Sequence, residues 1–335
     1  MKPRVFITQP VAESAIERMR AVADVRFNPD PLHILTRAEL CDAVHASDIL
    51  LCLLHDQVDR EVIAANPELR AIASMAVTPA NIDVAEATRR GIPVTVIPAP
   101  LLDDATADLA FGLMLSVGRR IAEADRFVRT GAMPGSQSRH FEAGGVSGRT
   151  LGILGVGGVG RAMARRAPGF AMRLLYHDPR RLSAADEAAL GLRWVPFESI
   201  FLESDFVSVH VNLNAQTRHL IGAREFASMK RTACFINTAR GAIVDEPELI
   251  RALAEGRIAG ARLDVHEHEP NIDPRLSAMP NVVLTPHVGS AVVGLREAMA
   301  NVVADNVIAI LSGRQPPNCW NPDIYAEGSS RTEKA

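Results

Sequence analysis

Short apolar runs recur along the chain and alternate with segments of helical periodicity. Most of the runs are continuous, which is typical of strands buried on both faces of a parallel sheet. Strands are predicted over Val5–Thr8, Ile49–Leu54, Ala71–Ala76, Val94–Ile97, Leu151–Gly155, Leu174–Asp178, Phe206–Val211, Ala233–Thr238, Ala261–Val265 and Val282–Thr285. Helices are predicted over Val11–Val22, Asp59–Ala65, Asp83–Arg90, Gly158–Ala167, Arg224–Met229 and Glu246–Glu255. This alternation predicts βαβ units and an α/β fold with open parallel sheets.

One helical segment is much longer than the others. Residues 103–129 keep helical periodicity, and Asp103, Asp104 and Thr106 suit the first turn of a helix. We therefore expect a single long helix that bridges two domains. A glycine-rich segment, Thr130–Gly148, follows it and predicts a long loop with a functional or interfacial role. Residues 326–335 are small, polar and charged, and we expect them to be disordered.

Composition narrows the class of protein. A chain of 335 residues predicts about two domains. It is 47% hydrophobic and has a net charge of −3, so it is not a disordered chain and carries no basic excess for nucleic acid. No apolar run approaches the ~20 residues of a membrane span, and the start lacks a signal peptide. Four cysteines without metal-binding or redox spacing fit a reducing compartment, so we expect a cytoplasmic protein.

A glycine-rich turn directly follows one of the predicted strands. The chain reads Gly155-Val156-Gly157-Gly158-Val159-Gly160 between a strand and a helix. The first glycine permits the tight bend, the second lets the backbone approach a pyrophosphate, and the third lets helix pack on strand. The N–H groups at the start of the helix attract phosphates. The pattern predicts a dinucleotide-binding turn.

The next predicted strand ends in an acidic residue. Asp178 comes eighteen residues after Gly160, where a carboxylate accepts hydrogen bonds from an adenosine ribose. A carboxylate there repels a 2′-phosphate, so NAD is predicted in preference to NADP. Arg180 and Arg181 follow closely and could soften this preference.

Three strands in the second half of the chain end in residues suited to hydroxy-acid chemistry. They are followed by Arg240, by the acidic segment His266–Glu269 and by His287. Because carboxyl ends of parallel strands share one edge of a sheet, we expect these groups to converge. Arginine binds a carboxylate as a fork, histidine moves the hydroxyl proton, and a carboxylate orients the imidazole. A metal site built from the histidines of this segment, its glutamates and His210 is a competing interpretation, which we rank lower because hydride transfer to a nicotinamide needs no metal.

Taken together, these motifs resemble the D-isomer-specific 2-hydroxyacid dehydrogenase family over residues 5–321. The resemblance rests on Gly155–Gly160, Asp178, Asn237–Gly241, Leu263–Val265, Glu269-Pro270 and Thr285–Ser290, with Asn81–Asp83 and Ala105–Ala110 in support. It implies two doubly wound, Rossmann-like domains. The NAD-binding domain, residues 101–288, is inserted into a substrate domain formed by residues 1–100 and 289–325. It also implies a homodimer paired through the long helix and loop, and an active site in the cleft between the domains.

The resemblance also assigns roles to residues. Arg240 binds the substrate carboxylate, His287 is the acid/base, and Glu269 is its partner, with Glu267 as a possible rival. The cofactor site comprises Gly155, Gly157, Gly158, Val159, Gly160, Arg161, Asp178, His210, Thr217, Thr238, Ala239, Asp264, Thr106 and Gly289. The substrate site comprises Val77, Thr78 and His55 together with Arg240, and no metal is expected.

Two positions, Thr78 and Asn212, differ from the family pattern, and further residues separate the chain from particular members of the family. Thr78 stands where a glycine is expected, and its β-branched side chain narrows that corner of the substrate site. Asn212 stands where a proline is common. Val77 occupies the place of the lysine in phosphite dehydrogenases. Phosphoglycerate dehydrogenases have an arginine near the position of His55, which replaces it only in part. Asp56 would repel the phosphate that those enzymes bind.

The predicted activity is therefore the interconversion of a small, unphosphorylated 2-keto acid and its D-2-hydroxy acid with NAD(H). Glyoxylate, hydroxypyruvate or a sugar-derived acid fits this class. Two alternatives stay open: a phosphite-dehydrogenase-like enzyme, and an NAD-sensing corepressor that binds a protein partner. No nucleic-acid or membrane partner is expected.

Overall fold

The chain forms two units, each built on its own parallel sheet. The computed structural model describes residues 2–326. One unit, unit 1, combines Met1–Leu101 with Ala291–Ala335, and the other, unit 2, is Leu102–Ser290. The segment 327–335, most of the tail for which disorder is predicted, lies outside the described residues. The α/β class with two parallel, Rossmann-like sheets is confirmed.

Unit 1 holds a five-stranded parallel sheet in the order β2-β1-β3-β4-β5. Its strands are β1 Arg4–Ile7, β2 Asp24–Phe27, β3 Ile49–Cys52, β4 Ala71–Ser74 and β5 Val94–Thr95. Its helices are α1 Glu13–Arg20, α2 Arg37–His45, α3 Arg60–Ala64, α4 Val84–Arg89 and α13 Val293–Leu311. Helices α2, α3 and α4 bury apolar side chains against one face of the sheet. This strand order reverses between β1 and β3, the place where sheets of this type bind ligands.

Unit 2 holds a seven-stranded parallel sheet in the order β12-β11-β10-β9-β6-β7-β8. Its strands are β6 Thr150–Leu154, β7 Arg173–His177, β8 Leu192–Trp194, β9 Phe206–Val209, β10 Cys234–Asn237, β11 Gly260–Leu263 and β12 Val282–Leu284. Its helices are α5 Asp103–Gly118, α6 Ile121–Arg129, α7 Gly158–Arg166, α8 Ala184–Leu190, α9 Phe197–Glu203, α10 Ala223–Ser228, α11 Glu246–Ala254 and α12 Pro274–Ala278. The chain changes direction across the sheet between β6 and β9, so this pair marks the expected ligand crevice.

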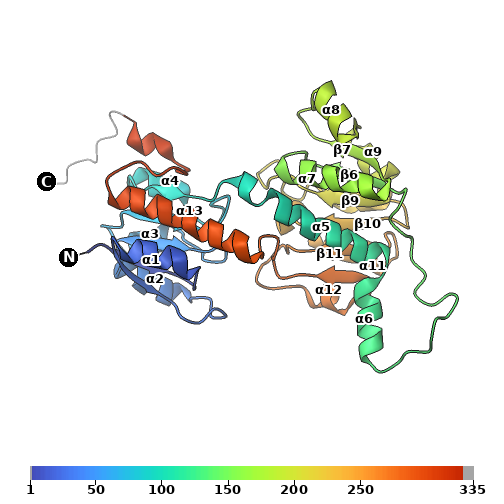
Figure 1. Cartoon of the computed structure of the whole chain (residues 1–335), viewed down its shortest axis with the longest axis horizontal. Helices are drawn as coiled ribbons and strands as arrows, with labels where there is room; N and C mark the ends of the chain where they lie inside the picture. The colour runs from blue at the N-terminus through green and yellow to red at the C-terminus, as the bar shows by residue number, and fades with distance from the viewer. Residues whose placement is uncertain (1, 327–335) are drawn as a thin grey trace. The chain divides into compact units, whose positions relative to one another are not determined.

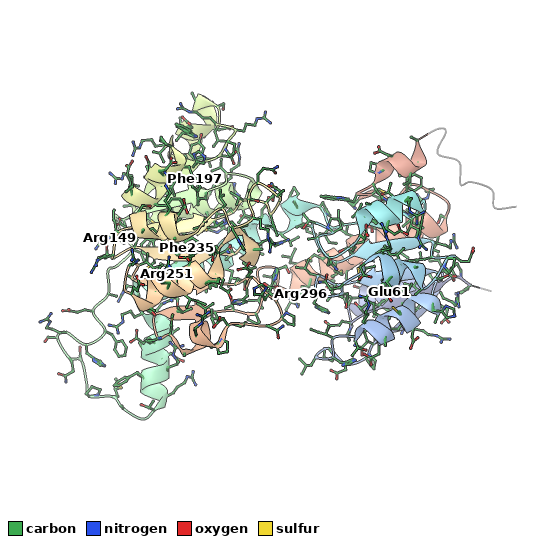
Figure 2. The ribbon with its side chains drawn as sticks, turned by 180° about the vertical axis from the view of Figure 1, so that it is seen from behind. Glu61, Arg149, Phe197, Phe235, Arg251 and Arg296 are labelled. Atoms are coloured by element: carbon green, nitrogen blue, oxygen red, sulfur yellow. The ribbon has the colours of Figure 1, made fainter. Side chains whose placement is uncertain are left out.

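Two apolar cores cover the two faces of the larger sheet. One lies under α5 and α7, and the other lies under α9, α10 and α11. Phe235 of β10 is fully buried in the second core, whereas Arg149 and Arg251 lie at the outer surface of unit 2 (Figure 2). Among the described residues, no helix has the length and apolar character to span a membrane.

The prediction of one long helix over residues 103–129 is wrong. The helix ends at Gly118, and a second helix, α6, starts after Arg120, which has a left-handed backbone with φ 52°. A side chain at Gly118 would lie 2.4 Å from Val146, so this close approach requires glycine. The Arg120 guanidinium then holds the turn by bonding the Glu123 carboxylate at 2.6 and 2.8 Å. Helix α6 and the loop after it project from the rest of the unit (Figure 1).

Candidate active site

The glycine-rich turn joins β6 to α7 in unit 2. Gly155 has φ +87°, and a Cβ there would lie 2.8 Å from the carbonyl oxygen of His210. A Cβ on Gly160 would lie 2.1 Å from the carbonyl oxygen of Gly155. Nothing lies within 4 Å of the place where Gly157 would carry its Cβ. A Cβ on Gly158, by contrast, would lie 1.8 Å from the carboxylate of Asp103. The two outer glycines therefore allow close backbone packing, and Gly157 is the position of the turn that stays open to a ligand.

Asp178 follows β7 and lies directly beside this turn. Its Oδ2 accepts a hydrogen bond of 3.0 Å from the N–H of Val156, and its Oδ1 accepts one of 2.9 Å from the N–H of Arg180. Each oxygen keeps a further lone pair for another donor. Arg161 reaches back from α7 and donates to the carbonyl oxygen of Val156 at 3.2 Å. The turn is thus held by its own polar residues, with a carboxylate positioned where a ribose would need an acceptor.

Three further predicted cofactor residues follow β9 and β10. Burial lowers the pKa of His210 to about 3, so its imidazole is neutral, and Nε2 lies 2.8 Å from the hydroxyl of Ser208. Thr238 is buried, and its hydroxyl oxygen has no hydrogen-bond partner within residues 2–326. Thr217 instead uses its hydroxyl in a local turn, where it donates to the carbonyl oxygen of Asn212 at 2.6 Å. Thr238 therefore has the clearest unmet capacity for a ligand.

His287 and Glu269 form a carboxylate–imidazole pair. The Nδ1 of His287 lies 2.8 Å from Oε2 of Glu269, and the N–H of His266 donates to Oε1 at 2.8 Å. Burial alone would raise the pKa of Glu269, but the bonds and charges of the histidines lower it below its usual range. An ionised Glu269 accepts a hydrogen bond from Nδ1–H, so Nε2 of His287 is the nitrogen available for proton transfer.

Asp264 fixes the segment that carries His287. Its Oδ1 accepts from the Thr285 hydroxyl at 2.6 Å and from the Val288 N–H at 2.8 Å, and its Oδ2 accepts from the Gly289 N–H at 2.9 Å. Its carbonyl oxygen accepts the N–H of His287 at 2.9 Å. His287 itself has φ 54°, a conformation that needs support from its neighbours. Asp264, expected beside the nicotinamide, therefore also clamps both sides of the proposed acid.

Arg240 follows β10 and is held by its own turn. Asn237 closes this turn, because its side chain accepts from the N–H of Ala239 and donates to the carbonyl oxygen of Arg240, each at 3.0 Å. Burial lowers the pKa of Arg240, and the charge of Glu269 works in the opposite direction. A guanidinium still keeps its charge near neutrality. A Cβ on Gly241 would lie 2.0 Å from the backbone of His266, so the arginine turn packs closely on the acidic segment.

Glu267 has a different partner from Glu269. Its carboxylate contacts Nε2 of His219 at 2.5 Å, and it accepts the N–H of Glu246 at 3.2 Å. Glu246 returns the contact by accepting the N–H of Glu267 at 3.2 Å. Glu269 is thus the carboxylate that contacts His287, whereas Glu267 links the acidic segment to His219 and to the start of α11. Sequence reasoning missed His219, because only the fold brings it to a residue 48 positions away.

The residues predicted to contact substrate in unit 1 lie after β3 and β4. Asp56 is buried, and its Oδ2 accepts from the Thr8 hydroxyl at 2.5 Å and the Leu53 N–H at 2.7 Å. Its Oδ1 lies 3.6 Å from Nε2 of His55 and has no hydrogen bond to any residue that the structure describes. Val77 and Thr78 are half-buried in the turn after β4. A second carboxylate–imidazole pair thus lies at the switch point of the smaller sheet.

The features of this site define a class of protein. An open phosphate turn, a carboxylate beside it and an Arg–Glu–His group at the carboxyl ends of one sheet are the parts of a dinucleotide-dependent oxidoreductase. The described residues contain no group of three or more His, Cys, Asp or Glu side chains that could hold a metal ion.

Comparison with known proteins specifies the family. Residues 111–289 match the model of the D-isomer specific 2-hydroxyacid dehydrogenase NAD binding domain. A glyoxylate reductase of Thermococcus litoralis is 46% identical over 97% of this chain and 98% of its own. A Thermus thermophilus protein of known structure has a TM-score of 0.87 and 36% identity, over 95% of this chain and 99% of that one. The glyoxylate reductase of Paecilomyes thermophila has a TM-score of 0.81 and 30% identity, over 95% and 98%.

The chain belongs to the D-isomer-specific 2-hydroxyacid dehydrogenase family. It is an NAD-dependent oxidoreductase, and its cofactor is NAD.

Proposed function

We propose that the enzyme reduces a small, unphosphorylated 2-keto acid to its D-2-hydroxy acid with NADH, and catalyses the reverse reaction with NAD. The observation that carries this proposal is the 2.8 Å contact between His287 and an ionised Glu269 on the sheet edge that also bears Arg240. That group supplies a proton donor, its anionic partner and a carboxylate-binding cation. A 2-keto acid needs all three.

The residues divide the chemistry between them. Nε2 of His287 donates a proton to the keto oxygen during reduction and takes it back during oxidation. Glu269 orients the ring and stabilises its protonated form. Arg240 binds the substrate carboxylate as a fork and fixes the direction of the keto group. When bound, the nicotinamide supplies the hydride acceptor or donor.

The residues present fit that cofactor. The open position at Gly157 and the start of α7 would take the pyrophosphate, and Asp178 would accept from the ribose. The orphaned hydroxyl of Thr238 would gain a partner from the bound nucleotide. A Cβ on Gly289 would lie 3.4 Å from the hydroxyl oxygen of Thr106. These two residues are therefore neighbours in unit 2, and both would line the cofactor site.

The preference for NADH over NADPH should depend on Asp178. Replacing Asp178 with Ala removes like-charge repulsion against a 2′-phosphate, so we expect the ratio of kcat/KM for NADH over NADPH to fall by about tenfold or more. Steady-state kinetics with both cofactors measures this ratio. Asp24→Ala removes an exposed carboxylate that lies 3.5 Å from Arg26, and should leave the ratio unchanged. A wild-type enzyme that used NADPH more efficiently than NADH would contradict the assignment.

The substrate proposed is unphosphorylated because the carboxylate of Asp56 lies beside His55. Its charge would repel a phosphate, while the imidazole can bind a hydroxyl or carboxylate. The relatives named glyoxylate reductase make glyoxylate the first compound to test, followed by hydroxypyruvate and longer keto acids. The test is turnover of this panel with NADH, monitored by loss of its absorbance. Absence of turnover with every 2-keto acid would reject the proposal.

Substitution of each glutamate of the acidic segment should reveal the partner of His287. In Glu269→Gln the imidazole loses the anionic acceptor that orients its Nδ1–H at 2.8 Å, so kcat for reduction should fall by about tenfold or more. The measurement is steady-state reduction of the best keto acid with NADH. The matched control is Glu267→Gln, which removes a carboxylate bonded to His219 and should keep nearly full turnover. If only the Glu267 variant loses turnover, the partner has been misassigned.

We infer further that two copies of the chain pair through α6. This helix buries none of its side chains within the described residues, and it exposes Ile121 by 53% and Val128 by 52%. Light scattering should give a mass near twice 36.1 kDa. Ile121→Glu with Val128→Glu should yield monomers, whereas Leu202→Glu, at another exposed apolar position, should not. A monomeric wild type would reject this pairing.

The cytoplasmic location expected from the sequence remains a prediction.

A further inference from the structure

Two arginines follow Asp178 in the turn after β7, and they differ in their contacts. Arg180 is exposed, and within residues 2–326 its side chain forms no hydrogen bond or ion pair. Arg181 instead donates to both carboxylate oxygens of Glu187 on α8, from Nε to Oε1 at 2.9 Å and from Nη2 to Oε2 at 3.0 Å. Its guanidinium carbon also lies 5.7 Å from the centre of the Trp194 ring. Arg181 is therefore held by a carboxylate and by an aromatic ring.

Glu187 is itself fixed by a buried tyrosine. The hydroxyl of Tyr176, a residue with no exposed surface, donates to Oε1 of Glu187 at 2.8 Å and accepts the N–H of Leu182 at 2.9 Å. The hydrogen bonds from Arg181 and Tyr176 lower the pKa of Glu187, so its carboxylate is ionised at neutral pH. The Glu187 side chain is 14% exposed, and its contact with Arg181 is bidentate. Such a pair holds an arginine better than a single contact on an open surface does.

This network lies beside the carboxylate proposed to bind the adenosine ribose. Nε1 of Trp194 donates to the carbonyl oxygen of Asp178 at 3.4 Å, and Arg181 comes three positions after Asp178. An arginine near this acidic position is the group that accommodates the 2′-phosphate in NADP-dependent enzymes. Glu187 occupies the Nε–Nη2 edge of Arg181, an edge with which a guanidinium forms a fork with two oxygens, and neutralises its charge.

We propose that Glu187 is a second determinant of the preference for NAD, because it withholds Arg181 from a 2′-phosphate on the adenosine ribose. Asp178 repels the phosphate, and Glu187 binds the cation that would otherwise attract it. The inference rests on the ribose-binding role proposed for Asp178, and it goes beyond that role by assigning a part in cofactor choice to α8. Arg180 is then the arginine of this turn that stays free to weaken the preference.

Dissociation constants from fluorescence titration with NADPH and NADH test the proposal without turnover. The parent protein is Asp178→Ala, in which the direct repulsion of a 2′-phosphate is removed. Adding Glu187→Gln keeps an acceptor for Tyr176 but removes the charge that holds Arg181, so Kd for NADPH should fall by about fivefold. Kd for NADH, which has no 2′-phosphate, should change by less than about twofold.

A third substitution identifies the cation responsible. Adding Arg181→Met to the double variant should remove the gain in NADPH affinity, whereas adding Arg180→Met should remove less of it. If the gain persists without Arg181, Glu187 acts through its own charge and the proposal is overturned. An unchanged Kd for NADPH in the Glu187 variant overturns it as well, as does an equal fall in both constants.

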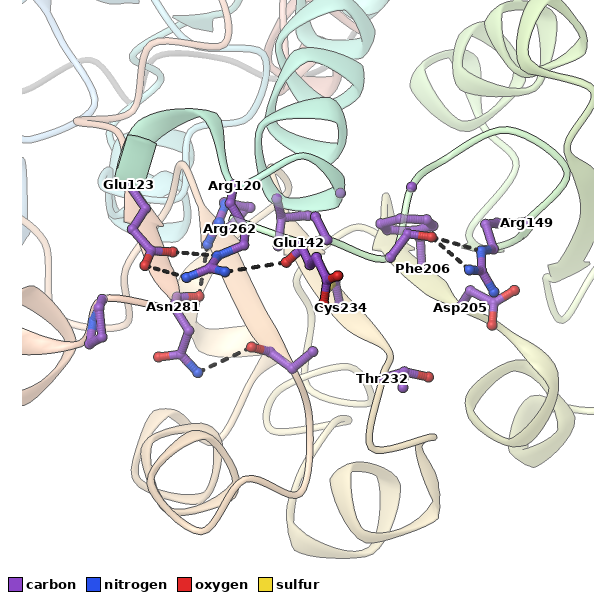
Figure 3. A pocket seen from close by; sticks show the side chains of 17 residues that line it. Arg120, Glu123, Glu142, Arg149, Asp205, Phe206, Thr232, Cys234, Arg262 and Asn281 are labelled. Carbon is purple, nitrogen blue, oxygen red and sulfur yellow. Dashed lines mark hydrogen bonds and ion pairs between the residues drawn. The ribbon is translucent and has the colours of Figure 1, made fainter. Parts of the chain in front are cut away.

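The control is an arginine–glutamate pair outside this network. Glu255→Gln removes a carboxylate that Arg257 contacts at 2.6 Å after α11, and should change neither constant. The bidentate pair of Glu123 with Arg120, at a cavity of unit 2 (Figure 3), is closer in geometry but belongs to the segment proposed for pairing.

Two provisions keep the result decisive. If Asp178→Ala does not fold, Asp178→Asn, which keeps an acceptor for the N–H of Val156, is the parent. A failure of the proposed reaction would appear as absent turnover with every 2-keto acid, while the dissociation constants would still follow the expected pattern. A failure of the present proposal would change that pattern and leave turnover intact.

Discussion

Replacing His287 with Gln should lower kcat for keto-acid reduction by about 10²-fold or more. Glutamine keeps a polar side chain of similar length but cannot give up a proton at Nε2, so the keto oxygen would gain charge without neutralisation. The 2.8 Å contact with Glu269 and the clamp formed by Asp264 position the imidazole before the substrate arrives. The measurement is steady-state reduction with NADH and the best keto acid of the panel.

A neighbouring histidine provides the control for this result. His268 lies in the same acidic segment but is exposed, and its carbonyl oxygen accepts the N–H of Asn271 at 2.8 Å. His268→Gln should keep nearly full turnover, and both variants should bind NADH with unchanged affinity by fluorescence titration. Wild-type turnover in His287→Gln would remove His287 from the mechanism. A loss of turnover that accompanies lost NADH binding would instead mean that the substitution disturbed the cofactor site.

The parts of the fold that could be read from the sequence are those fixed by local chemistry. The glycine-rich turn was predictable because Gly155 must adopt a positive φ and Gly160 must tolerate backbone contact, and only glycine does both without strain. The strand ends bearing Arg240 and His287 were predictable because buried parallel strands leave continuous apolar runs that stop at polar residues. Short or exposed strands leave weaker patterns, so β2 and β8 were missed.

The features that the sequence could not supply depend on contacts between distant segments. The helical pattern of the sequence continues past Gly118, whereas helix α5 ends there. Val146, which packs against Gly118, comes from a segment 28 positions further along the chain. The choice between Glu267 and Glu269 was open, because two glutamates two positions apart look equivalent until the fold directs one to His219 and the other to His287.

Asp264 connects the predictable and unpredictable parts of the site. The strand β11 brings it to the sheet edge, and its carboxylate accepts bonds from Thr285, Val288 and Gly289 on the following strand end. Oδ1 accepts two of these hydrogen bonds and Oδ2 accepts one, so one lone pair of Oδ2 is left for a further donor. The carboxylate therefore mainly holds the backbone around His287. Arg240 has no equivalent clamp on its guanidinium, whose one hydrogen bond in the described residues goes to the carbonyl oxygen of Ala239. The proposed acid is therefore fixed in advance, while the proposed carboxylate anchor has donors to spare.

The unbonded N–H groups of the Arg240 guanidinium are the reason to expect a large effect from the substitution Arg240→Lys. Arg240→Lys keeps the positive charge but replaces a planar fork with a single ammonium group, so the carboxylate of the keto acid loses one of two directed bonds. We expect KM for the keto acid to rise by about tenfold or more and kcat to fall as well, because orientation toward the hydride is lost together with binding. NADH affinity should stay near the wild-type value, since Asp178 and the glycine-rich turn are untouched. Steady-state kinetics and NADH fluorescence titration measure the two effects separately. The matched control is Arg224→Lys, at an arginine of α10 whose side chain is 79% exposed and lies 3.7 Å from Glu198, which should change neither. A variant that lost NADH affinity but kept its KM would place Arg240 in the cofactor site, and the mechanism would then need another anchor for the substrate carboxylate.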